Sequence, residues 1–344
     1  MNNIFQTLLA LFEKNKGYIN KNLYIKFSKD KGWGVYAKKK ISLNIKESLI
    51  KLPLNLTINK AEMLNFIKSK KTDYICLEFL RTYLDTLPNI EFYKNNHPYF
   101  CNNIEKDLMI QILKKNFFLK NSLIQQLRTF ELLDNIEQFV FLTFLTRTGE
   151  NNNKNFLMPI IDIVNFDYNH EPIQIDSGYN FISIDYHKSI KVDEEIFVKY
   201  AENYDPIEFF LSYGFVTKDY KSFRIPRNAL FFETSGNKIS NPSFIKKQNK
   251  YYFTEDLIFK KEEIPKNLNN FLSIFPNKNN SFLEIIEAYE KSIDLNLIKK
   301  ISEEKEYSEV IKKFCKSVEL HLENIRLYKI LFIFRNNFGA SEGN

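Results

Sequence analysis

The sequence predicts an α+β protein in which a β-rich domain is interrupted by a helical insert and followed by a mainly α-helical C-terminal domain. Short β-type runs precede residue 58 and return between 156 and 200, whereas the residues between them carry a helical pattern. Near the C-terminus, apolar residues recur every three or four positions. We expect the β-rich domain over 1–220 with its insert at 59–150, the helical domain over 221–338 and a frayed tail over 339–344.

Length and composition agree with a folded protein of two domains. The chain has 344 residues, of which 44% are hydrophobic and 26% charged, so it can bury large cores and is not globally disordered. The net charge of +7 accompanies a richness in Lys, Asn, Ile, Phe and Tyr that AT-rich coding would produce. The basic residues are scattered and are not interleaved with stacking aromatics, so we expect no direct nucleic-acid binding.

Cysteine use and hydropathy indicate a reducing compartment. The three cysteines are far apart and form no CxxC pair, which excludes a zinc ribbon and argues against a disulfide scaffold. We therefore expect no metal site and a cytoplasmic location, with a nuclear location left open. We also expect a monomer. The apolar run 4–12 reads as an amphipathic helix because it has neither the basic start nor the cleavage site of a signal peptide. Without a run of 18 apolar residues, we expect no membrane association.

The first strand-rich region contains a glycine-rich turn. Strand-type runs at 23–27 and 48–52 flank the segment 31–37, which contains Gly32-Trp33-Gly34. Glycines in a turn let the backbone approach a ligand closely, although a lone G-x-G is common in ordinary turns. It is not a dinucleotide-binding fingerprint, because the third glycine and the following helix are missing.

The insert and the segment after it carry the next signals. Leu123, Leu127, Phe130 and Leu133 share one helical face, and an apolar run over 136–142 leads to Arg147. We expect a loop at 151–153 and a strand over 156–164. Asp162 and Asn165 interrupt this apolar segment. Because buried polar groups need partners, both should bond either to backbone or to a ligand.

Two tyrosines follow in the second strand-rich region. After strands expected at 180–186 and 195–200 comes Tyr200, then a short helix starting at Pro206 with Asp205 as its cap, and then Tyr213. Tyrosines are usually packing residues, although a tyrosine hydroxyl can orient an amine without carrying charge. The final helix is indicated by a stripe of Val310, Phe314, Val318, Leu322 and Ile325.

Taken in order, these motifs resemble those of the SET-domain methyltransferases. The G-x-G turn, the helical insert, D-x-x-N at 162–165, E-E-x-x-x-x-Y ending at Tyr200 and Y-G-F-V at 213–216 are all present. The chain is most similar to the Rubisco large-subunit methyltransferase-like class, with smaller matches at Pro53, at 83–84 and at 87–88. The resemblance implies a split SET domain, a C-terminal substrate-binding domain, and protein-lysine N-methylation with S-adenosyl-L-methionine as cofactor.

The resemblance also assigns roles to individual residues. Gly32, Trp33 and Gly34 would contact the cofactor through their backbone. Arg147 would approach its carboxylate, for which a bidentate cation is the natural partner. Asp162 would lie beside the cofactor site.

The remaining assignments concern the adenine edge and the reacting amine. Asn165 with Phe166 would hold the adenine edge and the methionine portion, and Tyr200 and Tyr213 would line the channel where amine meets methyl. A narrow apolar channel lowers the pKa of a lysine ammonium by desolvation, which supplies the neutral nucleophile.

Two departures from the family pattern keep other functions open. Phe166 stands where the family usually has histidine, with His170 four residues on, and Pro206 follows Asp205 where a Ser-Asn pair is common. These changes admit a catalytically weak or inactive SET-fold protein-binding module. Histidine N-methylation is a further alternative, against which Tyr213 argues. The partner would be a protein substrate such as a ribosomal protein, a translation factor or a histone. His97, His187 and His321 are isolated and read as ordinary surface or core residues.

Overall fold

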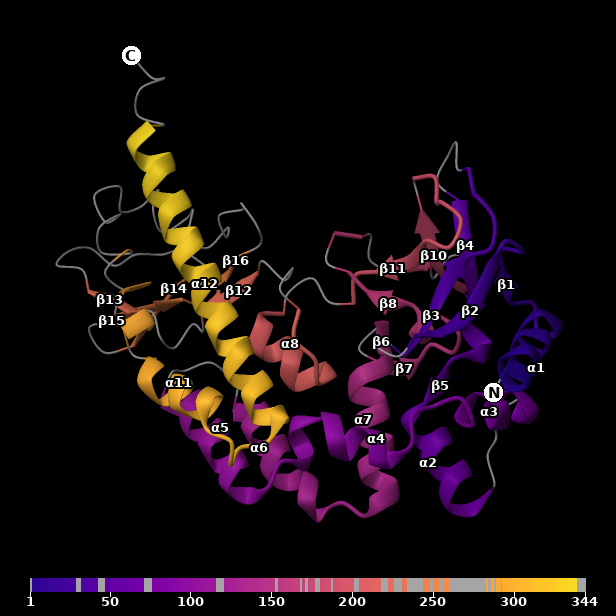
Figure 1. Ribbon diagram of the computed structural model, residues 1–344, viewed down its shortest axis with the longest axis horizontal. Helices are drawn as coiled ribbons and strands as arrows, with labels where there is room; N and C mark the ends of the chain where they lie inside the picture. Colours follow the sequence, from indigo (N-terminus) through magenta and orange to yellow (C-terminus); the bar gives the residue numbers. More distant parts are fainter. Residues whose placement is uncertain are drawn as a thin grey trace. The chain divides into compact units, whose positions relative to one another are not determined.

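The architecture is that of a computed structural model (Figure 1), in which the chain divides into two units. The first unit comprises Met1–Tyr93 and Leu132–Glu202, the second Lys94–Glu131 and Asn203–Asn344. The structure describes residues 2–28, 32–42, 47–70, 76–115, 121–151, 154–167, 169–170, 173–176, 180–186, 188–200, 204–217, 222–225, 231–233, 244–247, 250–253, 257–259, 283, 286–287, 289–291 and 293–338.

Three sheets form the β part of the first unit. One has the order β1-β4-β10-β9 with antiparallel neighbours, and a second has the order β2-β3-β11-β8, in which β8 runs parallel to β11. The third is β5-β7-β6. Their bounds are β1 Tyr18–Ile19, β2 Leu23–Ser28, β3 Gly32–Ala37, β4 Glu47–Pro53, β5 Ile58–Asn59, β6 Thr148–Asn151, β7 Lys154–Leu157, β8 Asn165–Phe166, β9 Gln174–Asp176, β10 Phe181–Tyr186 and β11 Glu195–Val198.

The helices of this unit begin at well-defined caps. Asn59 and Glu62 form a capping box at the start of α2, and Asp134 and Glu137 form another at the start of α7. Helix α7 starts after its N-cap Asp134 and ends at Arg147, so this arginine lies at the C-terminal end of the helix. The bounds are α1 Asn2–Lys14, η1 Leu54–Leu56, α2 Lys60–Ser69, α3 Leu77–Leu84, α7 Asn135–Arg147 and η4 Ile161–Ile163, with α4 Ile90–Asn96 crossing the unit boundary.

The apolar faces of these helices and sheets meet in one core. Phe5, Leu8 and Phe12 of α1 are buried in it, which confirms the amphipathic N-terminal helix. The strands expected at 23–27, 48–52 and 180–186 are confirmed as β2, β4 and β10. Burial of these faces supplies the main driving force for folding of the unit.

The strand expected over 156–164 is wrong in its second half. Strand β7 ends at Leu157, and a turn at Pro159 and Ile160 leads into η4. Proline has no N–H for a sheet ladder, and Ile160 has a φ of 74°, which is unusual for a β-branched residue. The turn places Asp162 on a tight helical turn instead of a strand.

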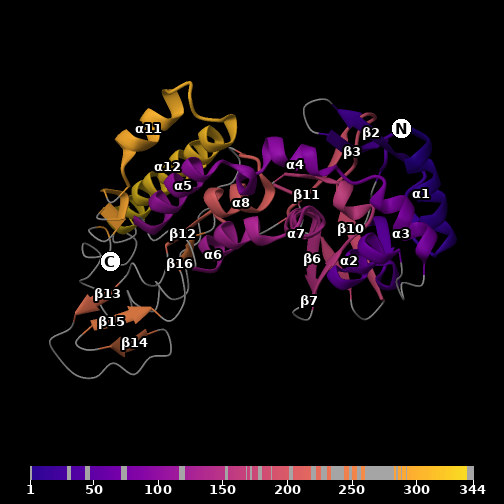
Figure 2. The same cartoon turned by 90° about the horizontal axis from the view of Figure 1, so that it is seen from below.

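The second unit combines helices with short strands. Over 223–259 the described residues are strands, with β12 pairing β16 and β15 lying between β13 and β14. Both views of the ribbon place α5 beside α12 (Figures 1 and 2). The bounds are η2 Pro98–Phe100, α5 Asn103–Lys115, α6 Asn121–Thr129, η3 Phe130–Leu132, α8 Pro206–Tyr213, β12 Phe223–Ile225, β13 Phe231–Glu233, β14 Phe244–Lys247, β15 Lys250–Phe253, β16 Leu257–Phe259, α11 Leu295–Glu303 and α12 Glu309–Phe338.

The final helix follows the pattern expected for it. All members of the predicted stripe on α12, from Val310 to Ile325, are buried. Helix α8 starts at Pro206 with Asp205 as its N-cap, again as predicted. The expected tail at 339–344 and His187 lie outside the described residues. In the portion that the structure describes, no helix is long and apolar enough to cross a membrane.

Candidate active site

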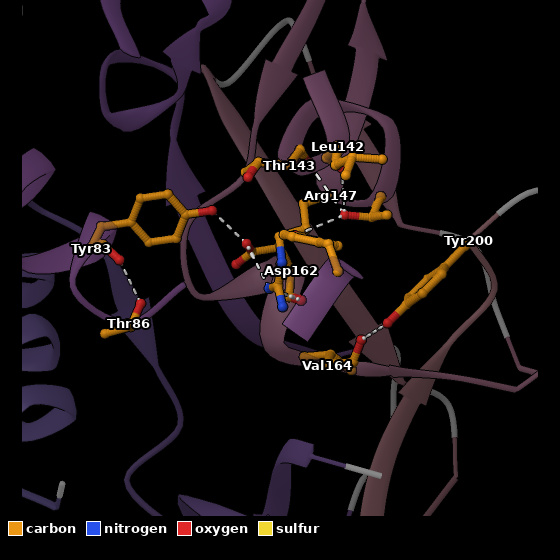
Figure 3. A network of polar contacts seen from close by, with 10 residues as sticks. Tyr83, Thr86, Leu142, Thr143, Arg147, Asp162, Val164 and Tyr200 are labelled. Atoms are coloured by element: carbon orange, nitrogen blue, oxygen red, sulfur yellow. Dashed lines mark hydrogen bonds and ion pairs between the residues drawn. The ribbon is translucent and has the colours of Figure 1, made fainter. Parts of the chain in front are cut away.

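A buried ion pair lies at the end of α7 in the first unit (Figure 3). Arg147 Nη1 lies 3.2 Å from both the backbone oxygen and Oδ2 of Asp162. From α3, the hydroxyl of Tyr83 donates to the same Oδ2 at 2.5 Å. Tyr83 of α3 and Arg147 at the end of α7 thus converge on the carboxylate of Asp162, which lies on a tight turn.

Burial determines the electrostatics of this cluster. The side chain of Asp162 is 1% exposed, and desolvation raises the pKa of its carboxyl while the charge of Arg147 opposes the rise. Burial, followed by the charge of Asp162, raises the pKa of Tyr83 well above its usual range, so its hydroxyl stays a donor. Desolvation tends to lower the pKa of Arg147, but Asp162 together with the nearby Tyr93 and Tyr83 more than offsets it, so the pKa is raised and the arginine stays cationic.

Tyr200 approaches the same turn from its other side. Its hydroxyl donates to the backbone oxygen of Val164 at 2.7 Å, and Figure 3 shows Tyr83 and Tyr200 on opposite sides of Asp162. Burial raises the pKa of Tyr200 above its ordinary value, so the phenol is neutral near pH 7. The ring of Phe166 packs against that of Tyr200 with centroids 5.4 Å apart. The structure therefore brings Phe166 and Tyr200 together.

Asn165 joins this segment to the glycine-rich strand β3. Its Nδ2 donates to the backbone oxygen of Trp33 at 3.2 Å and to Oε1 of Glu195 at 2.7 Å. Because both neighbours are acceptors, the amide nitrogen must face them and the amide oxygen Oδ1 faces away. The parallel pairing of β8 with β11 places Asn165 opposite Phe197 and holds this arrangement in register.

The three residues of the G-x-G turn have different surroundings. Gly32 starts β3 with a φ of 76° and open space around it, whereas Gly34 is buried against Asn165 and Glu195. The ring of Trp33 packs against Phe5 and Phe27, with centroids 4.3 and 5.2 Å away. The space at Gly34 is therefore taken up by side chains of this chain.

We predict that Gly34→Ala destabilises the protein by about 1–3 kcal/mol through overpacking. A Cβ at this position would lie 2.6 Å from Glu195 Oε1 and 3.0 Å from Asn165 Nδ2, so their hydrogen bond must shift. Urea unfolding measures the loss. Adding Glu195→Ala to Gly34→Ala should recover part of it, and two losses that simply add would contradict this packing.

Within the described part of the chain, Arg147, Asp162 and Asn165 each carry a donor or acceptor atom without a partner. Among the described residues, Arg147 Nε and Nη2 and Asn165 Oδ1 have no hydrogen-bond partner. Asp162 Oδ1 is buried and also lacks a partner there. Within this described part, a guanidinium with unpaired N–H groups and an amide oxygen without a partner suit the two ends of a small zwitterionic ligand, since a carboxylate can meet the former and an amine the latter.

Tyr213 lies in the second unit, at the C-terminal end of α8. Its half-buried ring packs against Phe209, Phe215 and Tyr204, with centroids 4.7, 6.2 and 6.3 Å away. Gly214 ends the helix with a φ of 76° and donates its N–H to Phe210 O. Tyr213 and Tyr200 therefore belong to different units.

A buried polar network holds the start of α8. Asp205 Oδ1 accepts from the N–H groups of Ile207 and Glu208, and burial raises the pKa of Asp205 to about 6. Glu208 pairs with Arg224 at 3.3 Å, and Asp205 Oδ2 lies 3.9 Å from His321 Nδ1. The start of α8 is thus held next to β12 through Arg224 and next to α12 through His321.

His97 contacts the other end of α8. The imidazole is 1% exposed, and its Nε2 donates to Ser212 O at 3.3 Å. Because burial disfavours the charged ring, the pKa of His97 falls to about 4. His97 and His321 are thus both buried core histidines, as expected from the sequence.

Stability should fall between pH 6.5 and pH 4 through His97. Its folded pKa lies below its unfolded value, so its contribution is fully present above pH 6.5 and is lost as the pH falls toward 4. The slope should approach about 1.4 kcal/mol per pH unit from this group. Urea unfolding at pH 6.5, 5.5 and 4.5 should therefore show a flatter dependence for His97→Phe than for wild type, and equal slopes would contradict the assignment.

The sequence does not predict the contacts of two tyrosines in this unit, Tyr83 and Tyr186. Tyr83 shares a helix face with buried Phe79 and Leu80, and a hydroxyl on such a face is a signal that a buried acceptor lies opposite. The hydroxyl of Tyr186 accepts a hydrogen bond from the N–H of Phe197 at 2.8 Å and donates one to the backbone oxygen of Phe197 at 2.7 Å.

The fold is similar to that of solved SET-domain structures, which confirms the predicted α+β class. The SET domain of LSMT bound to lysine and AdoHcy is 15% identical, with a TM-score of 0.56 over 98% of this chain and 92% of that one. Rubisco LSMT bound to AdoMet is 15% identical, with a TM-score of 0.54 over 96% and 92%.

A third structure, Rubisco LSMT bound to sinefungin and monomethyllysine, is 14% identical, with a TM-score of 0.56 over 98% of this chain and 93% of that one. No family model and no curated protein sequence matches the chain. At this level of identity, the likeness establishes the fold, and it extends over nearly the whole chain.

Proposed function

We propose that the protein is an S-adenosyl-L-methionine-dependent protein-lysine N-methyltransferase. The observation that carries the proposal is the convergence of Arg147, Asp162, Asn165 and Tyr200 on one tight turn of a SET fold. The similar solved structures are bound to AdoMet, to AdoHcy with lysine, or to sinefungin with monomethyllysine, which supports the same chemistry here. Fold likeness alone would not assign an activity, so the proposal depends on these residues.

The residues present fit the proposed cofactor. Its carboxylate needs a cationic donor, and the open Nε and Nη2 of Arg147 provide a planar fork whose charge Asp162 maintains. Its amino groups need acceptors, and Asn165 Oδ1 is oriented away from its own partners. When bound, S-adenosyl-L-methionine supplies an electrophilic methyl group on a sulfonium.

The tyrosines orient the nucleophile. A lysine amine has a pKa of about 10.4 in water and must lose its proton before it can attack. Tyr200 is itself protonated, and its hydroxyl proton is held by Val164 O, so it meets an amine as a neutral acceptor and not as a base. We assign the second orienting hydroxyl to Tyr213, whose aromatic neighbours favour the neutral amine by excluding water.

Calorimetric titration with S-adenosyl-L-methionine tests the cofactor site. Wild type should bind, and Arg147→Lys should bind about tenfold more weakly, because lysine keeps the charge and loses the bidentate fork. Lys68→Arg is the matched control, since Lys68 pairs with Asp134 and Glu137 on the surface. Absence of binding by folded wild type would instead favour the alternative of a SET-fold protein-binding module, to which Phe166 also points.

A further inference from the structure

The turn that carries Tyr213 is held from both sides by one short segment of the second unit. Nε2 of His97 donates to the oxygen of Ser212, the residue before Tyr213. On the other side, a Cβ built on Gly214 would lie 3.0 Å from Asn96 O and 3.1 Å from His97 Cδ2. Both neighbours of Tyr213 therefore abut residues 96–97.

From this geometry we infer that His97 is a positioning residue that sets the orientation of the Tyr213 phenol. The inference rests on the proposed function, in which Tyr213 orients the substrate amine. The last carbonyls of a helix have no partner within it, so a buried donor at Ser212 O decides how the final turn closes. A different closure would rotate the Tyr213 side chain.

The imidazole is suited to this role because it is neutral and buried. It is 1% exposed, and its ring lies 5.3 Å from that of Tyr99. A neutral histidine has one N–H, and the carbonyl opposite Nε2 requires that the proton sit there. The neutral ring thus donates from Nε2 alone, whereas a charged imidazole would donate from both nitrogens.

The other end of α8 is fixed independently, which confines the effect of His97 to the last turn. Asp205 caps the N-terminus, and the Glu208–Arg224 pair ties the first turn to β12. Losing the His97 bond therefore leaves the helix in place and releases the turn at Ser212–Gly214. Methyl transfer should suffer more than substrate binding.

Steady-state kinetics of two variants separate positioning from packing. His97→Gln keeps an amide donor at a similar reach, and His97→Phe keeps an aromatic ring without the donor. We expect kcat to fall about tenfold in His97→Phe with KM within about twofold, and to stay within about twofold in His97→Gln. In a Tyr213→Phe background, His97→Phe should add less than about twofold, because both act through one hydroxyl. Independent, multiplying losses would overturn the inference.

A readout besides activity distinguishes failure of this inference from failure of the proposed function. In protein labelled with 3-fluorotyrosine, the fluorine resonance of Tyr213 is the one that Tyr213→Phe removes. It should shift in His97→Phe and stay in place in His97→Gln and in Ile301→Val, a core control on α11 with a fully buried side chain. A Tyr213 resonance unmoved in folded His97→Phe would overturn the inference. A shift without any methyl transfer by wild type would leave it standing and refute the proposed function.

Discussion

Asp162→Ala is expected to lower the free energy of unfolding by about 3–5 kcal/mol, the usual effect of removing one partner of a buried ion pair. The carboxylate accepts from both Arg147 Nη1 and the Tyr83 hydroxyl, and its side chain is 1% exposed. Without it, the Tyr83 phenol loses its acceptor, and Arg147 keeps only the uncharged backbone oxygen of residue 162 as a partner for Nη1. The cost comes mainly from the uncompensated charge of Arg147.

Urea unfolding of four proteins measures this effect. After Asp162→Ala, the further change Arg147→Met should cost little or restore stability, because it removes the stranded charge. Asp193→Asn is the control, since exposed Asp193 likewise accepts a tyrosine hydroxyl, that of Tyr24 at 2.9 Å, and asparagine tolerates its positive φ of 59°, so stability should change by less than about 0.5 kcal/mol. Equal losses in Asp162→Ala and Asp193→Asn would contradict a buried ion pair at Asp162.

Tyr213→Phe should lower kcat for methyl transfer by about 10²-fold, as the loss of one preorganised hydrogen-bonding group does in other active sites. The change keeps the ring that packs against Phe209 and Phe215 and removes only the hydroxyl. Binding of S-adenosyl-L-methionine should stay within about twofold of wild type, because we assign the cofactor contacts to other residues.

Transfer of labelled methyl to the protein substrate, together with calorimetry, tests this separation. Tyr24→Phe is the control for loss of a tyrosine hydroxyl elsewhere and should keep wild-type activity, since that hydroxyl bonds only at the surface with Asp193. A Tyr213→Phe enzyme as fast as wild type would remove Tyr213 from the mechanism and leave Tyr200 as the sole orienting hydroxyl.

The elements that the sequence predicts well are those specified by local patterns. The buried stripe of α12 follows from apolar spacing, and the start of α8 follows from Asp205 and Pro206, which act within one helical turn. The α+β class follows from strands that recur on both sides of a helical insert. Each of these signals depends on neighbours along the chain.

The turn after β7 shows where such patterns fail. The run from Phe156 to Val164 is apolar enough for a strand, yet Pro159 and the positive φ of Ile160 break it after Leu157. Proline at this point was the available signal. The apolar side chains remain buried, so hydrophobicity alone does not distinguish the turn from a strand.

Contacts within the site depend on residues far apart in the chain. The order of the motifs predicts a shared site for four residues, and the structure brings them to one turn: Arg147, Asp162, Asn165 and Tyr200. Sequence could not pair Tyr83 with Asp162 or Asn165 with Glu195, because these pairs are 79 and 30 residues apart. Nor could it separate the packing of Gly34 from the open space at Gly32.

One measurement tests the proposed activity most directly: incubation of the protein with methyl-labelled S-adenosyl-L-methionine and a cell lysate that lacks this enzyme, followed by identification of the labelled amino acid by mass spectrometry. We predict methylated lysine in a protein of the lysate, with about 10²-fold less label when Tyr213→Phe replaces wild type. Label on histidine, or no label from wild type that is folded, would contradict it.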